Sequence, residues 1–450
     1  MTYSDTWRKK REGTFISFLL QLFLGGLQTS MIATSLLAYI KYEVKYKDKG
    51  FLFGLVGAIF NVIPILFGIL LSKCTDRTRK CKECILLCTF VSACGSLLYI
   101  LPFSPYCLVF GRLLNGFIPI TRPIMTSEIS RSYESNQLQV KLPQMATMTN
   151  LGYGMGPLFA LMFTTVDVWV GPLHLSYGNS CGLFLLVLTL IQLFVILMFV
   201  HNLSEEFDMK SEEVEVACTQ DNEIQPSEAE PLIDKNEGSV FKTRYSVLAV
   251  IGNLTTNLDS MLILVATSIL YMWTMLYYWG VSVLVIDIMH YKEQLVNIFY
   301  IIYSLGMTML IFILSKLHLT GKHVFYVGFI LTAIFLLIGA CVLIITHSAD
   351  VIMNKMFLLI FALGAGLSDV GEKFFLIVVF SKMLPTECQG VGESVRLTLR
   401  RLFGLVGTYL ATVAMMNFRY TYIVMSATVL MLLFGLWSRR KSLYSPKPFI

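Results

Sequence analysis

Long apolar stretches separated by short polar connections fill most of the chain. Each holds about 20 residues, enough for a helix to cross the roughly 30 Å hydrocarbon core of a bilayer. The first half contains Gly13–Tyr39, Phe51–Leu71, Cys84–Leu101, Pro105–Ser127, Pro143–Val166 and Cys181–Val200. The second half contains Ser260–Ile286, Gln294–Leu314, Val324–Thr346, Val351–Phe380, Val391–Met416 and Tyr420–Trp437. This pattern predicts an all-α membrane protein with twelve transmembrane helices.

An acidic polar segment separates the two sets of apolar stretches. It holds Glu205, Glu206, Asp208 and Glu212 but too little apolar surface to fold by itself. We therefore predict two pseudo-symmetric six-helix bundles, residues 1–200 and residues 246–450, the second with a short cytoplasmic tail. Residues 201–245 are predicted to form a flexible cytoplasmic linker between them.

The composition supports a membrane protein. Hydrophobic residues make up 56% of the chain and charged residues 14%, against roughly 25% charged residues in soluble domains. Lys and Arg concentrate in connections such as Arg8–Arg11 and Lys73–Lys82, which are cytoplasmic if both termini are cytoplasmic. We expect that topology. The net charge of +6 reflects it, so we expect no nucleic-acid partner.

The sequence offers little for catalysis or metal binding. Serine elbows, metal-binding His pairs and phosphate-binding loops do not occur in a suitable context. Cys81 and Cys84 have the spacing of a metal or redox pair, but no second pair or His cluster accompanies them. We therefore expect a protein that is not an enzyme, with no metal and no cofactor.

Charged side chains inside the predicted helices indicate a solute pathway, since each costs about 2.5–3.5 kcal/mol at mid-helix on insertion scales. The tenth stretch carries Asp369, Glu372 and Lys373 on one helical face. Arg112 in the fourth stretch is predicted to lie roughly 10 Å inside the membrane. We expect these four residues to line a central cavity.

The eleventh stretch adds Arg400 and Arg401. The apolar part that follows them, residues 402–416, is too short to cross a bilayer alone, so both should enter the membrane region. They either line the cavity or extend to the cytoplasmic headgroups, and the sequence leaves both alternatives open. Arg122, near the cytoplasmic end of the fourth stretch, is expected to reach the headgroups.

Three short motifs combine glycine with proline or charged residues. They are Gly68 with Asp76-Arg77 after the second stretch, Gly111-Arg112-Leu-Leu-Asn-Gly116 in the fourth, and Gly152-Tyr-Gly-Met-Gly156-Pro157 in the fifth. These motifs and their order resemble the major facilitator superfamily. The resemblance implies the major facilitator fold and transport of a solute.

The resemblance also implies roles for these residues. Asp76 and Arg77 would belong to a charge latch that holds one gate state, and Gly68 would permit close helix contact there. The alternative is an ordinary basic cytoplasmic loop. Glycines such as Gly116, Gly152 and Gly156 would let helices pack closely, and Pro157 would let its helix bend; the alternative is static packing.

Further segments resemble one branch of that superfamily, the lysosomal proteins of the domain-containing-8 type associated with neuronal ceroid lipofuscinosis. They are Phe380-Ser-Lys-Met-Leu384, Gln389-Gly-Val391 and Arg401-Leu-Phe-Gly404, together with the motifs around Arg112 and Gly156. This resemblance implies a late-endosomal or lysosomal membrane protein that moves an anion or a small organic solute.

The linker contains an independent indication of that compartment. Glu228 lies four residues before Leu232-Ile233, the pattern of acidic dileucine signals that clathrin adaptors bind as an extended peptide. A chance match in an acidic linker is the alternative. We expect the lipid bilayer, a small solute and, if the signal is used, such an adaptor as partners.

The predicted function is therefore secondary transport. Two bundles that rock about a midplane site would expose it alternately to the cytosol and the lumen. Guanidinium groups suit an organic or inorganic anion, because they can bind a carboxylate or phosphate bidentately. Two alternatives stay open: an anion channel on the same fold, and a nontransporting receptor or scaffold.

Overall fold

The computed structural model describes residues 5–44, 46, 48–101, 104–133, 135–171, 173–204, 247–288, 293–316, 376, 379–380, 383–384 and 389–444. Its N-terminal half contains α1 (Asp5–Tyr39), η1 (Ile40–Val44), α2 (Lys49–Ile59), α3 (Val62–Thr78), α4 (Cys81–Ile100), α5 (Pro105–Asn115), η2 (Ile118–Ile120), α6 (Thr121–Ser132), α7 (Ser135–Met162), β1 (Val168–Val170), β2 (Leu173–Leu175) and α8 (Tyr177–Phe199). Its C-terminal half contains α10 (Val247–Thr256), α11 (Leu258–Val283), η5 (Leu284–Ile288), α12 (Glu293–Lys316), α16 (Gln389–Met416), α17 (Phe418–Ser438) and α18 (Arg440–Tyr444).

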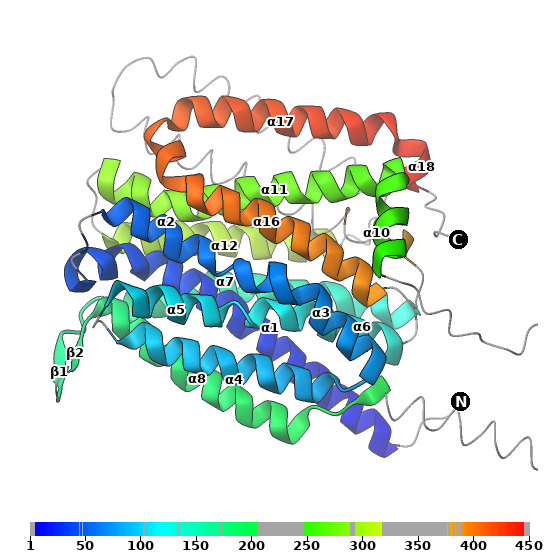
Figure 1. Cartoon of the computed structure of the whole chain (residues 1–450), viewed down its shortest axis with the longest axis horizontal. Helices are drawn as coiled ribbons and strands as arrows, with labels where there is room; N and C mark the ends of the chain where they lie inside the picture. Colours follow the sequence, from blue (N-terminus) through cyan, green and yellow to red (C-terminus); the bar gives the residue numbers. More distant parts are fainter. Residues whose placement is uncertain are drawn as a thin grey trace, which may run out of the picture.

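The long helices match the predicted apolar stretches and run roughly alongside one another (Figure 1). Five described stretches are long and apolar enough to cross a membrane: Thr6–Val44, Lys49–Thr78, Cys81–Ile100, Tyr177–Phe199 and Leu258–Ile286. The predicted helices over residues 324–346 and most of 351–380 lie outside the described residues. The start of α1 and the short helix α18 lie at one end of the molecule, and β1 and β2 lie at the other (Figure 1). Helix α10, which the hydropathy pattern does not predict, runs across the direction of the long helices (Figure 1).

The second predicted span is two helices, which corrects the prediction of one continuous helix. α2 ends at Ile59 and α3 begins at Val62, so Phe60 and Asn61 lie between them. Pro64 lies in the first turn of α3, where a helix does not need the N–H that proline lacks. The break therefore places an aromatic and an amide side chain in the middle of a membrane-spanning stretch.

The fourth predicted span is also interrupted. α5 and α6 are separated by η2, and Pro119 and Pro123 remove backbone donors from this region. Gly116 lies at the interruption, where a Cβ atom would stand 2.7 Å from the backbone oxygen of Phe60. The two interrupted helices thus meet at their breaks, and only glycine permits that approach.

A short hairpin adds two strands to the predicted all-α fold. β1 and β2 pair antiparallel, and Gly171 turns the chain at φ +60°, a conformation that glycine adopts easily. On β2, the two ring nitrogens of His174 lie 2.6 Å from Asp167 Oδ1 and 3.4 Å from Glu43 Oε2. Since Glu43 belongs to η1, this histidine ties the hairpin to the end of the first span.

The largest contacts between the two halves are those of α2 and α3 with α16 and of α7 with α12, and smaller ones join α1 to α11 and α6 to α16. Small residues bring these helices close together. A Cβ atom on Gly57 would lie 2.8 Å from Thr408 Cγ2 of α16, and one on Gly154 would lie 3.2 Å from Ser304 Cβ of α12. The contact surface between the halves therefore follows the second and fifth spans of the first half.

Candidate functional site

Arg112 is a fully buried cation at the junction of the halves. It lies near the end of α5 and is 0% exposed. Its guanidinium carbon lies 4.1 Å from the centre of the Phe60 ring. Within the described ranges, none of its three nitrogen atoms has a hydrogen-bond partner. Because an unpaired charge is costly to bury, this arrangement is suited to a bound anion.

Two further guanidinium groups come from α16 in the other half. The guanidinium carbon of Arg400 lies 4.0 Å from the centre of the Tyr271 ring. Arg401 donates a hydrogen bond from Nη1 to Asn61 Oδ1 at 3.0 Å, and its guanidinium carbon lies 5.8 Å from the Phe60 ring centre. The break between α2 and α3 thus supplies contacts to arginines from both halves.

We refer to Arg112, Arg400, Arg401, Phe60 and Tyr271 as the arginine site. The sequence predicts its three arginines but leaves open whether the pair on α16 points inward. Arg400 is 5% exposed and Arg401 is half-buried, and both contact aromatic residues of the interior. The structure therefore places the pair at the junction of the halves.

Three tyrosines are electrostatic neighbours of Arg112. Tyr99, Tyr153 and Tyr278 lie close enough to Arg112 to interact with it electrostatically, as does Arg401. The rings of Tyr153 and Tyr278 meet edge to face at 5.8 Å between centroids. None of these tyrosines is a predicted site residue. The tyrosine-rich stretch of α11 could have indicated Tyr278, and Tyr153 lies inside the glycine motif of the fifth span.

Arg122, which the sequence predicts to reach the headgroups, lies near charged residues of the second half. It is half-buried on α6 and interacts electrostatically with Glu393, Arg396 and Arg400 of α16. Arg396 is 0% exposed and forms an ion pair with Glu393, with Nη2 2.5 Å from Oε1. This charged group therefore joins α6 to α16 on the side of the arginine site that lies toward the start of α16.

The halves also touch through uncharged groups on this side. Ser394 donates a hydrogen bond to Ser72, with 2.6 Å between the two Oγ atoms, and both residues are buried. One turn earlier on α3, a Cβ atom on Gly68 would lie 3.8 Å from Thr398 Oγ1. Gly68 thus lies at the contact between α3 and α16, where its resemblance to the family motif implies close helix contact.

Asp76 has a partner that the sequence does not reveal. Its Oδ1 accepts hydrogen bonds from Arg131 Nη2 at 2.6 Å and from Ser127 Oγ at 3.0 Å. Both donors lie on α6, whereas the neighbouring Arg77 is exposed. The charge pair after the second span therefore joins α3 to α6 within the N-terminal half.

The residues that follow α8, at the end of the first half, form hydrogen bonds with α4 and α6. Glu128 on α6 is 1% exposed and accepts hydrogen bonds from the backbone N–H of Ser204 at 2.8 Å and from its hydroxyl. Asn202 donates to the carboxylate of Glu83 at 3.0 Å. Burial raises the pKa of the Glu128 carboxyl, and the hydrogen bonds from Ser204 oppose that shift. The start of the predicted linker is thus bound to α4 and α6.

The glycine motif of the fifth span packs α7 against α1. A Cβ atom on Gly152 would collide with the backbone oxygen of Phe23, and one on Gly156 would collide with Ser30 Oγ. Pro157 follows in the same helix and is buried. Gly152 and Gly156 therefore serve packing within the first half.

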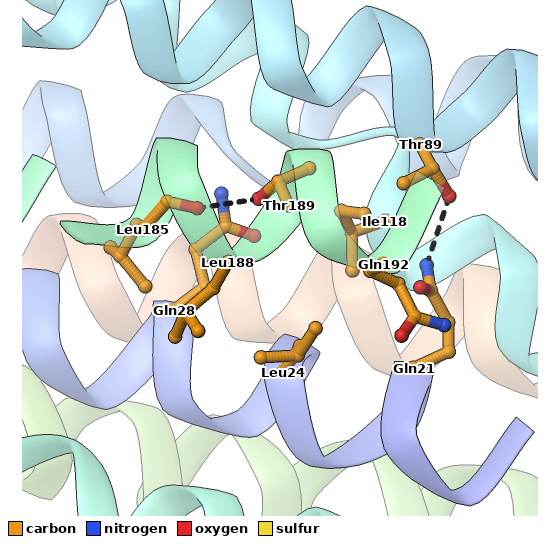
Figure 2. Close-up of a pocket in the computed structure, with 10 residues that line it drawn as sticks. Gln21, Leu24, Gln28, Thr89, Ile118, Leu185, Leu188, Thr189 and Gln192 are labelled. Atoms are coloured by element: carbon orange, nitrogen blue, oxygen red, sulfur yellow. Dashed lines mark hydrogen bonds between the residues drawn. The ribbon is translucent and has the colours of Figure 1, made fainter. Parts of the chain in front are cut away.

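A small polar cavity lies inside the N-terminal half, between α1, α4 and α8 (Figure 2). Gln21, Gln28 and Gln192 line it, and Gln21 Nε2 donates to Thr89 Oγ1 at 3.2 Å. Each glutamine has one buried amide atom with no partner among the described residues. A small cavity lined by these amide groups suits an ordered water molecule. None of its lining residues belongs to the arginine site.

Several predicted residues lie outside the described residues. They are Asp369, Glu372 and Lys373 of the tenth span and Glu228, Leu232 and Ile233 of the linker. Across the described ranges, no group of three or more His, Cys, Asp or Glu side chains is arranged to hold a metal ion.

Solved structures with a similar fold are transporters. The human organic anion transporter MFSD10 (TETRAN) is 15% identical with a TM-score of 0.62, over 94% of this chain and 99% of that one. A D-xylose-proton symporter is 13% identical with a TM-score of 0.64, over 94% and 96%. The nucleoside transporter NupG is 13% identical with a TM-score of 0.59, over 94% and 99%. Identities this low show the fold alone.

A search of curated proteins by sequence gave no match. The family model described as Major Facilitator Superfamily matches residues 18–408, which is most of the chain. The fold, the paired halves and this match agree. The chain is therefore a membrane transporter that belongs to the major facilitator superfamily.

Proposed function

We propose that this transporter carries an anion and that the anion binds at the arginine site. The unpartnered, fully buried guanidinium group of Arg112 is the observation that supports this most strongly. The described residues that act on it electrostatically are three tyrosines and Arg401, none of which is negatively charged at neutral pH. A bound anion would supply the missing charge and the missing hydrogen-bond acceptor.

The position of the site fits transport by alternating access. Arg112 and Phe60 belong to the first half, and Arg400, Arg401 and Tyr271 belong to the second. A rocking motion of one half against the other would therefore change the access to a ligand held by both. MFSD10, whose fold is similar, is described as an organic anion transporter, which is compatible with this proposal.

Uptake into proteoliposomes tests the proposal. The purified full chain would be reconstituted and offered labelled chloride, phosphate, acetate, benzoate and the neutral solutes xylose and uridine. We expect saturable uptake of at least one anion, loss of that uptake in Arg112→Ala, and normal uptake in Arg8→Ala, which removes an exposed arginine. Uptake of neutral solutes alone, or full anion uptake by Arg112→Ala, would contradict the proposal.

We further propose a late-endosomal or lysosomal location, directed by a clathrin adaptor that binds Glu228, Leu232 and Ile233. The support is the motif and the resemblance to a lysosomal branch of the family. We expect Leu232→Ala combined with Ile233→Ala to move a tagged protein to the plasma membrane. Unchanged lysosomal staining of that variant would contradict the use of this signal.

A further inference from the structure

The shape of the arginine site restricts which anion can bind. The guanidinium carbon of Arg112 lies 4.1 Å from the centre of the Phe60 ring. A guanidinium group donates hydrogen bonds only in its own plane, through five N–H bonds arranged as a fork. The available donors therefore point along the edge of the group, where a planar carboxylate can accept two parallel hydrogen bonds.

The neighbouring cations add less hydrogen-bonding capacity than their number suggests. Arg401 already donates from Nη1 to Asn61, and Arg400 lies over the Tyr271 ring at 4.0 Å and has additional contacts. A phosphate can accept the same two parallel hydrogen bonds, but its further charged oxygens need donors of their own. Among the described residues, Arg112 is the only member of the site whose guanidinium nitrogens all lack a partner, and it offers them in one plane.

The body of the ligand would meet aromatic rings. Tyr153 on α7 and Tyr278 on α11 both lie near Arg112, one from each half. Tyr278 also packs edge to face on Tyr300 of α12, with ring centroids 4.7 Å apart. Such rings favour a flat apolar group, and they offer little to a small, strongly hydrated inorganic ion.

Taken together with the proposed function, on which this inference rests, the geometry points to a flat organic carboxylate as the transported anion. We infer that its carboxylate binds along the edge of Arg112 and that its ring or planar body lies against Tyr153 and Tyr278. Tyr278 is then a specificity-determining residue, because it distinguishes an aromatic carboxylate from a small one.

Ligand binding to the purified full chain in detergent tests this inference, with the melting temperature measured against ligand concentration. The probes are benzoate, acetate, which has the charge without the ring, benzamide, which has the ring without the charge, and chloride. We expect benzoate to bind at least about tenfold more tightly than acetate, benzamide or chloride. Arg112→Ala should lose binding of both carboxylates.

Variants at Tyr278 test whether the ring of the ligand is recognised independently of its carboxylate. Tyr278→Leu should weaken benzoate binding more than acetate binding, so that the preference for benzoate falls by about tenfold, and Tyr278→Phe should keep the preference. Equal binding of chloride, acetate and benzoate that depends on Arg112 would overturn the flat carboxylate but keep the anion site. Anion binding that is the same in wild type and Arg112→Ala would overturn the proposed function itself. Should Tyr278→Leu fail to fold, Tyr153→Leu gives the same comparison from the first half.

Discussion

Ser72 and Ser394 lie on different halves of the transporter, yet their Oγ atoms are only 2.6 Å apart. Ser72 belongs to α3 and Ser394 to α16, and this pair of helices forms one of the largest contacts between the halves. The hydrogen bond lies on the side of the arginine site toward the start of α16. Any rocking of the halves that opens this side must break it.

Cross-linking this pair should stop transport. In a variant with Cys74→Ser, which removes the exposed native thiol nearby, Ser72→Cys and Ser394→Cys should form a disulfide under mild oxidation. We expect solute uptake to fall to background on oxidation and to return on reduction, because a fixed contact blocks opening. The measurement is proteoliposome uptake before and after each treatment.

Each single cysteine variant is the control and should be insensitive to the oxidant. Full uptake by the cross-linked double variant would show that the contact between α3 and α16 does not open during transport.

Gly152 should tolerate even a methyl group poorly. Gly152→Ala places a Cβ atom against the backbone oxygen of Phe23, and this oxygen cannot move without shifting α1. We expect destabilisation of about 1–3 kcal/mol, as for other overpacked cores, seen as a lower melting temperature in detergent. Gly306→Ala on α12 is the matched control, because a Cβ there meets nothing within 4 Å. Equal melting temperatures for the two variants would contradict the close packing of α1 on α7.

The hairpin contact at His174 should depend on pH. Hydrogen bonds to Asp167 and then to Glu43 raise the pKa of His174 above its ordinary value of 6.5. A group with a raised folded-state pKa contributes stability that is complete below about pH 6.5 and is lost as the pH rises through the folded-state pKa. The contact should therefore be strongest in an acidic compartment.

Melting temperatures of wild type and His174→Gln across a pH series check this. The difference between them should be largest in acidic buffer and should shrink as the pH rises. In Asp167→Asn, which removes the largest cause of the shift, the decline should move to lower pH. A difference that does not change with pH would rule out protonation of His174 as its source.

Hydropathy predicts the positions of the long helices, because the bilayer requires apolar stretches of a fixed length. It does not predict the two breaks. Whether a membrane helix can break depends on what contacts the freed backbone, and here Gly116 of the fourth span faces the backbone oxygen of Phe60 in the second. The hydropathy of a single stretch does not reveal a contact between two segments that are distant in the chain.

Part of the candidate site could likewise be predicted from the sequence, and part could not. Charge within a span is enough to single out Arg112, Arg400 and Arg401, since each is expensive in lipid. Their aromatic partners carry no such signal. The ion pair between Asp76 and Arg131 joins residues far apart in the chain, so only the tertiary structure reveals it.

If the arginine site carries an anion by alternating access, benzoate inside a proteoliposome should speed the entry of benzoate from outside, and a trans-acceleration assay measures this. Proteoliposomes containing the full chain would be preloaded with unlabelled benzoate, and the uptake of labelled benzoate would be measured against its concentration. We expect uptake that saturates with benzoate concentration and that internal benzoate accelerates. Arg112→Ala should lose both the saturation and the acceleration. Flux that rises in proportion to concentration, with no acceleration by internal benzoate and no effect of Arg112→Ala, would contradict alternating access at the arginine site and favour a channel or another site.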